Sequence, residues 1–309
     1  MQLIIFISLL IWSLLDPTKN LWLVIAVGLG IAISSATQDI TIDALRIEQI
    51  KENEKNLLAA GAAMSVVGWW TGYKLGGLVS LLSADILQKQ GVENYWQISF
   101  LILSGIIALC SVVLLFVPEK NSKEKINSQN IADQKMLNRI GSFNIFTKSF
   151  SWLYGTIINP LLSFFKKNTV SVAISILGFV FLFKIGEAFL GRMSLVFYKE
   201  IGFSKTDIAL YSKGIGWLTT VTFTLLGGLF AVRMGLIKAM FLSGILMAST
   251  NLLFSILAWV GNSEILFAFT VLIDDLAAAF ATVAFVGFIS ALVDRNYTAT
   301  QYALLASIG

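Results

Sequence analysis

The sequence predicts an all-α polytopic membrane protein, and three observations support this fold class. Apolar residues make up 57% of the 309 residues, whereas charged residues make up only 13%. The mean hydropathy of +0.81 lies outside the range of soluble globular domains. Several apolar runs exceed the roughly 20 residues that a helix needs to cross a bilayer. We therefore expect about eight spans and the start of a ninth in one helical bundle.

Polar breaks set the limits of the expected spans. Residues 1–15 form a charge-free run that is short for a span, and a polar turn at residues 16–20 follows it. A polar loop at residues 48–56 ends the next span, and Pro118 ends the fourth. The full spans are expected at residues 21–47, 57–84, 95–117, 169–198, 206–232, 236–260 and 265–293, with the start of another from residue 297.

The chain is expected to divide into two partial helical halves, residues 1–117 and 169–309. Between them, residues 118–168 are rich in Lys, Asn and Ser and form the only long linker. Residues 152–165 of this linker are partly apolar and are expected to form an interfacial helix. Fourteen of the 22 basic residues lie on alternate connections that include the linker, and four lie on the opposite connections. The positive-inside rule therefore predicts a cytoplasmic N-terminus and linker.

The composition excludes several classes of function. The chain has no His and a single Cys, Cys110. His-based metal sites, haem ligation by His, Ser-His catalysis and an internal disulfide are therefore excluded. We expect neither an enzyme nor a cofactor, and any protonation switch must use Asp or Glu. The basic residues lie in the connections, so the formal charge of +4 does not indicate a nucleic-acid partner.

The second expected span contains charge near its end. Asp39 and Asp43 are four residues apart and share one helix face, and Arg46 follows within reach of Asp43. A carboxylate that faces lipid costs roughly 2.5 kcal/mol or more at the helix centre, so we expect these acids to line a cavity. The alternative is an ion pair of Asp43 and Arg46 at the headgroups.

Other spans also carry charge. Lys74 lies near the middle of the third span, where a side chain cannot easily reach either surface. Lys184 and Glu187 are three apart in the fifth span and form either a structural ion pair or a substrate-facing group. Asp274 and Asp275 are adjacent in the eighth span and point about 100° apart, so only one faces a cavity squarely.

Small and aromatic residues mark one surface of the third span. Gly68, Gly72 and Gly76 are spaced four apart, which predicts a groove for close helix contact. Trp69 and Trp70 stand beside this groove. They belong either to helix packing or an interfacial belt, or to a pathway in which they could stack on a sugar ring.

Several of these residues fall in motifs of a known family. The run Thr37-Gln38-Asp39-Ile40-x-Ile42-Asp43-Ala44-x-Arg46 resembles the fourth-helix signature of AmpG-type muropeptide permeases, a branch of the major facilitator superfamily. Acetyl-coenzyme A transporters share a looser version. Gly72-Tyr73-Lys74, Gly202-Phe203-Ser204-Lys205-Thr206 and the run from Asn296 to Leu304 are similar to further motifs of the permeases, in the same order.

The resemblance implies a major facilitator-like helical bundle. It implies that the chain supplies the equivalents of helices three to ten and the start of eleven of a twelve-helix carrier, so the bundle is expected to be incomplete. The substrate and proton pathway is expected to contain Gln38, Asp39, Asp43, Tyr73, Lys74, Lys184, Glu187, Asp274 and Asp275. The implied gating loop contains Gly227, Gly228, Arg233 and Gly235, with Val232 at the position of the superfamily's acid.

The leading hypothesis is a multi-pass carrier of the bacterial inner membrane. It would import anhydro-muropeptides, the disaccharide-peptide fragments of peptidoglycan, with protons for cell-wall recycling. Its partners would be the lipid bilayer, protons, the small glycopeptide and a separately encoded fragment with the missing helices. The alternatives are a truncated or split, transport-inactive remnant, a carrier of another solute such as an acyl-coenzyme A, and an ion channel.

Overall fold

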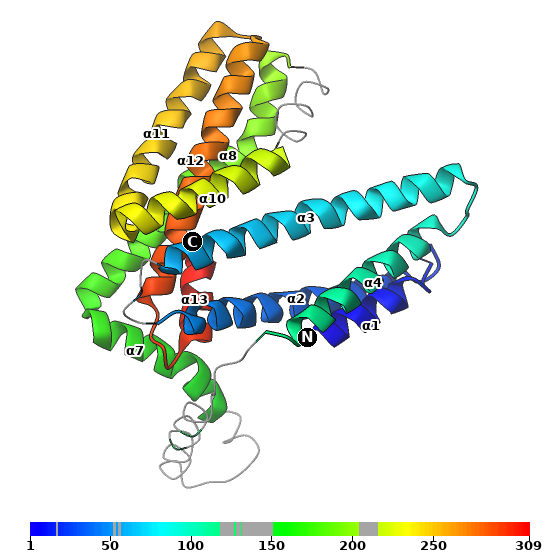
Figure 1. Ribbon diagram of the computed structural model, residues 1–309, viewed down its shortest axis with the longest axis horizontal. Coiled ribbons are helices and arrows are strands. Elements are labelled where there is room, and N and C mark those ends of the chain that lie inside the picture. The colour runs from blue at the N-terminus through cyan, green and yellow to red at the C-terminus, as the bar shows by residue number, and fades with distance from the viewer. Residues whose placement is uncertain are drawn as a thin grey trace. The chain divides into compact units, whose positions relative to one another are not determined.

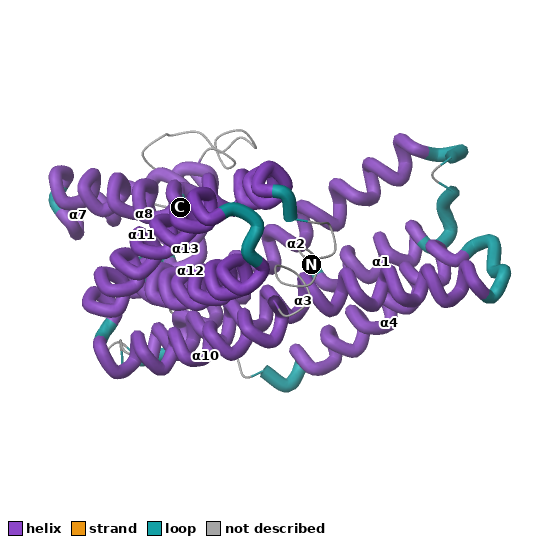
Figure 2. The backbone as a smooth tube through the Cα atoms, turned by 90° about the horizontal axis from the view of Figure 1, so that it is seen from above, coloured by secondary structure: helices purple, strands orange, loops and turns teal. Residues whose placement is uncertain are grey.

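The computed structural model describes residues 1–16, 18–51, 54, 57–117, 127, 131, 151–203 and 216–309. These residues form helices and no strand, which confirms the predicted all-α class (Figure 2). The helices are α1 (Gln2–Trp12), α2 (Leu21–Gln49), α3 (Leu57–Lys89), α4 (Tyr95–Leu114), the π-helix η1 (Tyr154–Ile158), α7 (Asn159–Asn168), α8 (Val170–Ile201), α10 (Gly216–Met234), α11 (Leu236–Val260), α12 (Glu264–Leu292) and α13 (Thr298–Ile308).

Six of the described helices are both long and apolar enough to cross a membrane: α2, α4, α8, α10, α11 and α12. They match the second, fourth, fifth, seventh and eighth expected spans. Helix α10 matches the sixth from residue 216 on, and residues 206–215 of that expected span lie outside the described residues. Helix α3 has 33 residues, about 50 Å at 1.5 Å per residue, so it meets the requirement of length. Its glycines, serines and charges lower its hydropathy, and it is not among these six helices. Helix α1, with 11 residues, is too short to cross.

The chain divides into two compact units. The first contains residues 1–45 and 68–119, and the second contains residues 46–67 and 120–309. Helices α2 and α3 therefore each contribute residues to both units. The expected halves, residues 1–117 and 169–309, stay a prediction, and the compact units differ from them by assigning residues 46–67 to the second unit.

In the first unit, Trp12 at the end of α1 joins three helices. Its indole Nε1 donates a hydrogen bond to the carbonyl oxygen of Val24 in α2 (3.0 Å). Its ring lies 5.2 Å from that of Phe100 in α4, which runs beside α1 (Figure 1). A Cβ added to Gly28 would come within 3.0 Å of the same indole. Gly28 therefore allows the end of α1 to lie close against α2.

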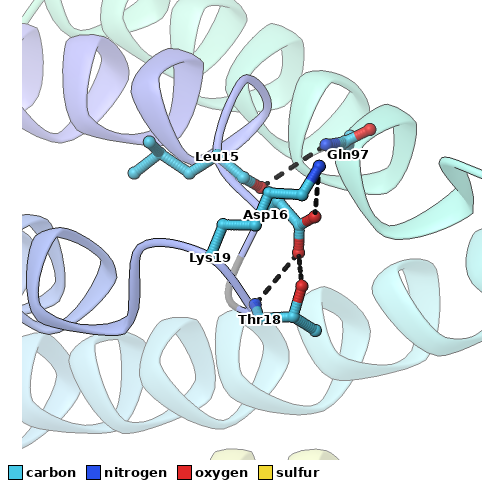
Figure 3. A network of polar contacts seen from close by, with 5 residues as sticks. All are labelled: Leu15, Asp16, Thr18, Lys19 and Gln97. Atoms are coloured by element: carbon cyan, nitrogen blue, oxygen red, sulfur yellow. Dashed lines mark hydrogen bonds and ion pairs between the residues drawn. The ribbon is translucent and has the colours of Figure 1, made fainter.

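The polar turn predicted between α1 and α2 is organised by Asp16 (Figure 3). Its carboxylate accepts hydrogen bonds from the Thr18 backbone N–H (2.9 Å) and hydroxyl (2.6 Å), and it forms an ion pair with Lys19 at 3.6 Å. The hydrogen bonds from Thr18 lower the pKa of Asp16 below its usual value. Gln97 of α4 donates to the carbonyl oxygen of Leu15 at 3.4 Å, which ties this turn to α4.

In the second unit, α12 is the helix against which the others pack. It packs along α11 and α10, and side-chain contacts such as Lys184 with Thr282 join it to α8 (Figure 1). One core cluster gathers the end of α2, the start of α3 and helices α7, α8, α12 and α13. Its buried members are Ile47, Leu58, Phe164, Ala173, Val180, Phe285, Ile289, Val293, Tyr302 and Leu305.

Residues 151–168 also belong to this unit and are helical throughout, as η1 and α7 with a short lead-in. The expected helix at residues 152–165 is thus present, and its place at a membrane surface stays a prediction. The Gln301 amide of α13 donates to the carbonyl oxygen of Pro160 (2.9 Å), and the Ser163 hydroxyl donates to Asp294 (2.9 Å). Helix α13 confirms the helix start predicted near residue 297.

Candidate functional site

Helix α8 carries the charged pair Lys184 and Glu187. Because the two residues are three apart, their side chains are neighbours on one helix face. Lys184 Nζ donates a hydrogen bond to Glu187 Oε2 and forms an ion pair with it. The Lys184 side chain is 16% exposed and the Glu187 side chain 34%. The pair therefore neutralises a lysine that is largely withdrawn from the surroundings of the helix.

Helix α12 supplies two further partners for this pair. The Thr282 hydroxyl accepts a hydrogen bond from Lys184 Nζ (3.0 Å) and donates one to Glu187 Oε1 (3.4 Å). Lys184 Nζ also lies 5.4 Å from the centre of the Phe285 ring, within the range of a cation–π interaction. We call these four residues the α8–α12 cluster. Its ammonium group is held by a carboxylate, a hydroxyl and a ring face.

The acids of α12 point in different directions. Asp274 accepts a hydrogen bond from the hydroxyl of Thr250, a buried residue of α11, at 2.9 Å. Asp275 is one residue further, about 100° around the helix. The second unit therefore joins Lys184 and Glu187 directly, whereas Asp274 is joined to α11 through Thr250.

Helix α2 carries the acids predicted for the first unit. It is continuous from Leu21 to Gln49, so Asp39 and Asp43 lie one turn apart, and their charges interact. Asp39 is exposed and Asp43 is half-buried. The buried Oε1 atom of Gln38 has no hydrogen-bond partner within the described part of the chain. An amide oxygen in this state is able to accept a hydrogen bond from a solute.

Arg46 lies at the end of α2 and belongs to the second unit. Its Nη2 donates a hydrogen bond to the hydroxyl of Ser290 in α12 (3.2 Å). Its guanidinium carbon lies 5.6 Å from the centre of the Tyr302 ring in α13. The sequence identified Asp43 as its partner, and that ion pair stays a prediction. The contacts with Ser290 and Tyr302 were not predicted.

Helix α3 carries Tyr73 and Lys74 within the first unit. Lys74 Nζ lies 5.1 Å from the centre of the Trp70 ring, a second cation–π contact. The Tyr73 ring stacks on the ring of Trp69, with centroids 5.7 Å apart. Both contacts arise within one helix, between residues four apart. That the predicted residues of both units form one pathway stays a prediction.

The expected gating loop forms the end of α10 and the start of α11. Arg233 lies in the last turn of α10, and Gly235 precedes α11 with φ 83°, a left-handed conformation that favours glycine. A Cβ added to Gly227 would come within 3.1 Å of the α12 backbone. One added to Gly228 would come within 2.6 Å of a side chain near the start of α3. These glycines therefore allow close helix contact, and the gating role stays a prediction.

The glycine groove expected on α3 differs from these packed glycines. A Cβ added to Gly68, Gly72 or Gly76 meets no atom within 4 Å among the residues that the structure describes. The close helix contact expected at this strip is therefore not formed within the first unit. Small residues permit close approach but supply no attraction of their own. The strip instead leaves the backbone of α3 open.

Sequence reasoning missed two threonines of this site, Thr250 and Thr282. A hydroxyl inside an apolar helix commonly bonds to the carbonyl four residues earlier, as Thr270 does with Leu266 at 2.7 Å. Spacing alone does not distinguish a threonine that reaches another helix. Within the described ranges, no three His, Cys, Asp or Glu residues gather in a way that could hold a metal ion.

Apolar helices that place charged groups inside their spans are a common feature of α-helical membrane transporters. The profile of the Major Facilitator Superfamily matches residues 1–309, and the chain belongs to this superfamily. Within the superfamily, the predicted AmpG-type resemblance is confirmed by relatives that bear that name or the name of anhydromuropeptide permease. No solved structure matches the chain.

Three relatives illustrate the similarity. A protein named AmpG 4 in Rickettsia felis is 31% identical over 298 residues, which cover 94% of this chain and 64% of the relative. The anhydromuropeptide permease of Escherichia coli K12 is 26% identical over 309 residues, 99% of this chain and 56% of the relative. A protein named AmpG 3 in Rickettsia prowazekii is 26% identical over 306 residues, 99% of this chain and 66% of the relative.

These comparisons settle the broad class. The chain is a multi-pass membrane protein of a transporter family, and the prediction that it is not an enzyme is confirmed by that membership. The chain spans 64% of the length of the Rickettsia felis relative and 56% of the length of the Escherichia coli relative.

Proposed function

We propose that the chain carries the pathway of a proton-coupled transporter that imports anhydro-muropeptides across the bacterial inner membrane. The observation that carries this proposal is the α8–α12 cluster, in which a withdrawn lysine is neutralised by a carboxylate within a span. The name of the Escherichia coli relative, anhydromuropeptide permease, supports the substrate class. The resemblance implies that such a substrate is a disaccharide joined to a peptide, and the peptide carries free carboxylates.

The cluster suggests how proton and solute are coupled. Lys184 Nζ is held by Glu187, so a carboxylate of the solute must compete with Glu187 for the same cation. Protonation removes the negative charge of Glu187 and weakens its hold on Lys184. A proton on Glu187 and a carboxylate on Lys184 therefore favour the same separated state of the pair. Two ligands that favour one state bind with positive coupling.

The acids of the first unit would supply a second group of sites. Asp39 and Asp43 present two carboxylates on one face of α2, and Gln38 adds an amide oxygen beside them. Lys74 would contact a further carboxylate of the solute. We propose Asp39 as the protonatable group of this set, since it lies one turn nearer the middle of α2 than Asp43 does.

We propose that the N-terminus and the linker at residues 118–168 face the cytoplasm, as the distribution of basic residues predicts. Single cysteines placed at the loop ends of α3 and α4, in a Cys110→Ser background, test this orientation. A membrane-impermeant thiol reagent added outside intact cells should label the connection at residues 90–94. Labelling of the opposite ends instead would reverse the orientation.

Uptake tests the function directly. Labelled anhydro-muropeptide is offered at pH 6 and pH 8 to cells that lack their own permease and express the chain alone or with a fragment supplying the family's remaining helices. The proposal is supported if, at pH 6, cells that express the chain take up more labelled muropeptide than cells with the empty vector. Uptake of a labelled acyl-coenzyme A in place of the muropeptide would identify a different solute. Uptake only with the added fragment would show that a partner chain is required.

A further inference from the structure

Three aromatic side chains form one continuous group at the middle of α3. The rings of Trp69 and Tyr73 lie nearly parallel, with 5° between their planes. Trp70 stands edge-on to both, with centroids 4.8 Å from Trp69 and 6.2 Å from Tyr73. The Lys74 ammonium lies over Trp70. We call Trp69, Trp70 and Tyr73 the α3 aromatic platform.

The platform is open along the helix. Trp69 is 58% exposed and Tyr73 is 69% exposed. On the neighbouring face, Gly68 and Gly72 have no atom within 4 Å of an added Cβ among the described residues. The other flank carries Lys74, because successive residues are about 100° apart around a helix. A flat aromatic surface is thus bordered by a bare backbone on one side and by a cation on the other.

The position of the platform argues against an interfacial belt. Belt aromatics lie at the ends of a span, at the depth of the headgroups. Tyr73 is the central residue of the 33-residue helix, about 24 Å from either end at 1.5 Å per residue, and Trp69 lies about 18 Å from the start and 30 Å from the end. A lysine that faces lipid at this depth is costly, whereas a lysine that faces a wet or ligand-filled space is not. The combination therefore fits a solute-binding surface.

We propose that the α3 aromatic platform binds the sugar rings of the transported solute and that Lys74 binds a carboxylate of its peptide. This inference rests on the proposed function and names a subsite for its disaccharide part. One face of a pyranose ring presents C–H groups, which pack against the electron-rich face of an aromatic ring. The parallel rings of Trp69 and Tyr73 provide such an apolar surface, and the open glycine flank leaves room for the sugar hydroxyls.

Equilibrium binding to the purified full chain in lipid nanodiscs tests the subsite. The labelled probes are the complete anhydro-muropeptide, its disaccharide without peptide, and its peptide without sugar. Trp69→Leu and Tyr73→Leu should each weaken binding of the disaccharide about tenfold, because each removes one stacking ring. Trp69→Phe and Tyr73→Phe keep a ring and should restore most of the affinity. Trp22→Leu, which removes an exposed Trp at the start of α2, is the matched control and should change nothing.

Lys74→Gln separates the two parts of the subsite. It should weaken binding of the peptide and of the complete muropeptide, while binding of the disaccharide stays unchanged. The sugar assignment would be overturned if Trp69→Leu and Tyr73→Leu weakened binding of all three probes equally, or of none. It would also be overturned if Trp22→Leu weakened binding of the disaccharide as much as these variants do. A wild-type chain that binds the disaccharide but not the complete muropeptide would overturn the proposed substrate and leave the platform standing. If the wild-type chain bound neither the disaccharide nor the complete muropeptide, both the proposed substrate and the proposed sugar subsite would be overturned.

Discussion

Replacing Glu187 by Gln tests the coupling at the α8–α12 cluster. The amide has nearly the shape of the carboxylate, and its single oxygen can still accept a hydrogen bond from Lys184. Its NH2 group cannot accept the bond from the Thr282 hydroxyl, and the amide carries no charge and does not titrate. Lys184 therefore keeps its Thr282 and Phe285 contacts and loses its counter-ion. The variant should mimic the protonated state of the pair at every pH.

The exposure of the pair sets the size of the effect. Ion pairs at exposed sites contribute about 0.2–1 kcal/mol. Removal of one partner from a fully buried pair costs about 3–5 kcal/mol. With side chains 16% and 34% exposed, the pair lies between these limits, so we expect a loss of about 1–2 kcal/mol of stability. Because a carboxylate solute no longer competes with Glu187, the same free energy should tighten its binding by about fivefold to thirtyfold.

The assay compares uptake and equilibrium binding of the anhydro-muropeptide at pH 6 and pH 8, normalised to protein in the membrane. Glu187→Gln should bind the solute tightly at both values and lose pH-dependent uptake. The matched control is Asp85→Asn at the end of α3, because Asp85 forms an exposed pair with Lys89 at 2.7 Å with side chains 53% and 74% exposed. That control should change neither property. Wild-type pH dependence and affinity in Glu187→Gln would refute the competition between Glu187 and the solute.

Three further predictions follow from the structure. Asp39→Asn should fold normally and lose pH-dependent uptake, since it removes a titratable group at nearly constant shape, and unchanged uptake at pH 6 and pH 8 would remove Asp39 from the mechanism. Gly228→Ala should lower the thermal unfolding temperature by crowding α3, at a cost of about 1–3 kcal/mol. Gly178→Ala in α8, where an added Cβ meets nothing within 4 Å, should instead raise it slightly. Burial alone would raise the pKa of Asp294, but hydrogen bonds from Asn296 and Ser163 and the Lys167 charge outweigh it and lower that pKa. The lowered pKa stabilises the fold above the unfolded-state value, near pH 4, and this contribution is lost as pH falls through the folded value. Asp294→Asn should therefore be less stable than wild type at pH 7, and the difference should shrink in thermal unfolding scans below about pH 4.

Local spacing was sufficient to predict contacts within one helix. The Lys184 and Glu187 pair follows from a separation of three residues, and the structure forms that pair. The hydropathy of the chain likewise predicted the apolar helices, because a span is defined by its own length and composition. The prediction that Asp39 and Asp43 share one helix face required only that the helix be continuous.

Contacts between helices could not be predicted in this way. Arg46 had a local candidate partner one turn away, yet its contacts include Ser290, 244 residues further along the chain. The four-residue spacing of Gly68, Gly72 and Gly76 in α3 predicted close packing. In the structure, the closely packed glycines are instead the adjacent Gly227 and Gly228 of α10. In both cases the sequence shows what a surface permits. Which neighbour lies against that surface depends on the packing of distant segments.

Both mid-helix lysines lie over an aromatic ring in their own unit, Lys74 over Trp70 and Lys184 over Phe285. A ring face offsets part of the cost of withdrawing a cation from water, by about 0.5–2 kcal/mol, and leaves its full charge in place. A carboxylate offsets more of that cost but neutralises the cation. Coupling through separation of the pair requires that the free-energy cost of the withdrawn lysine stays small after its partner carboxylate is protonated. The ring of Phe285 meets this requirement, because it contacts Lys184 from α12 and is independent of the charge on Glu187.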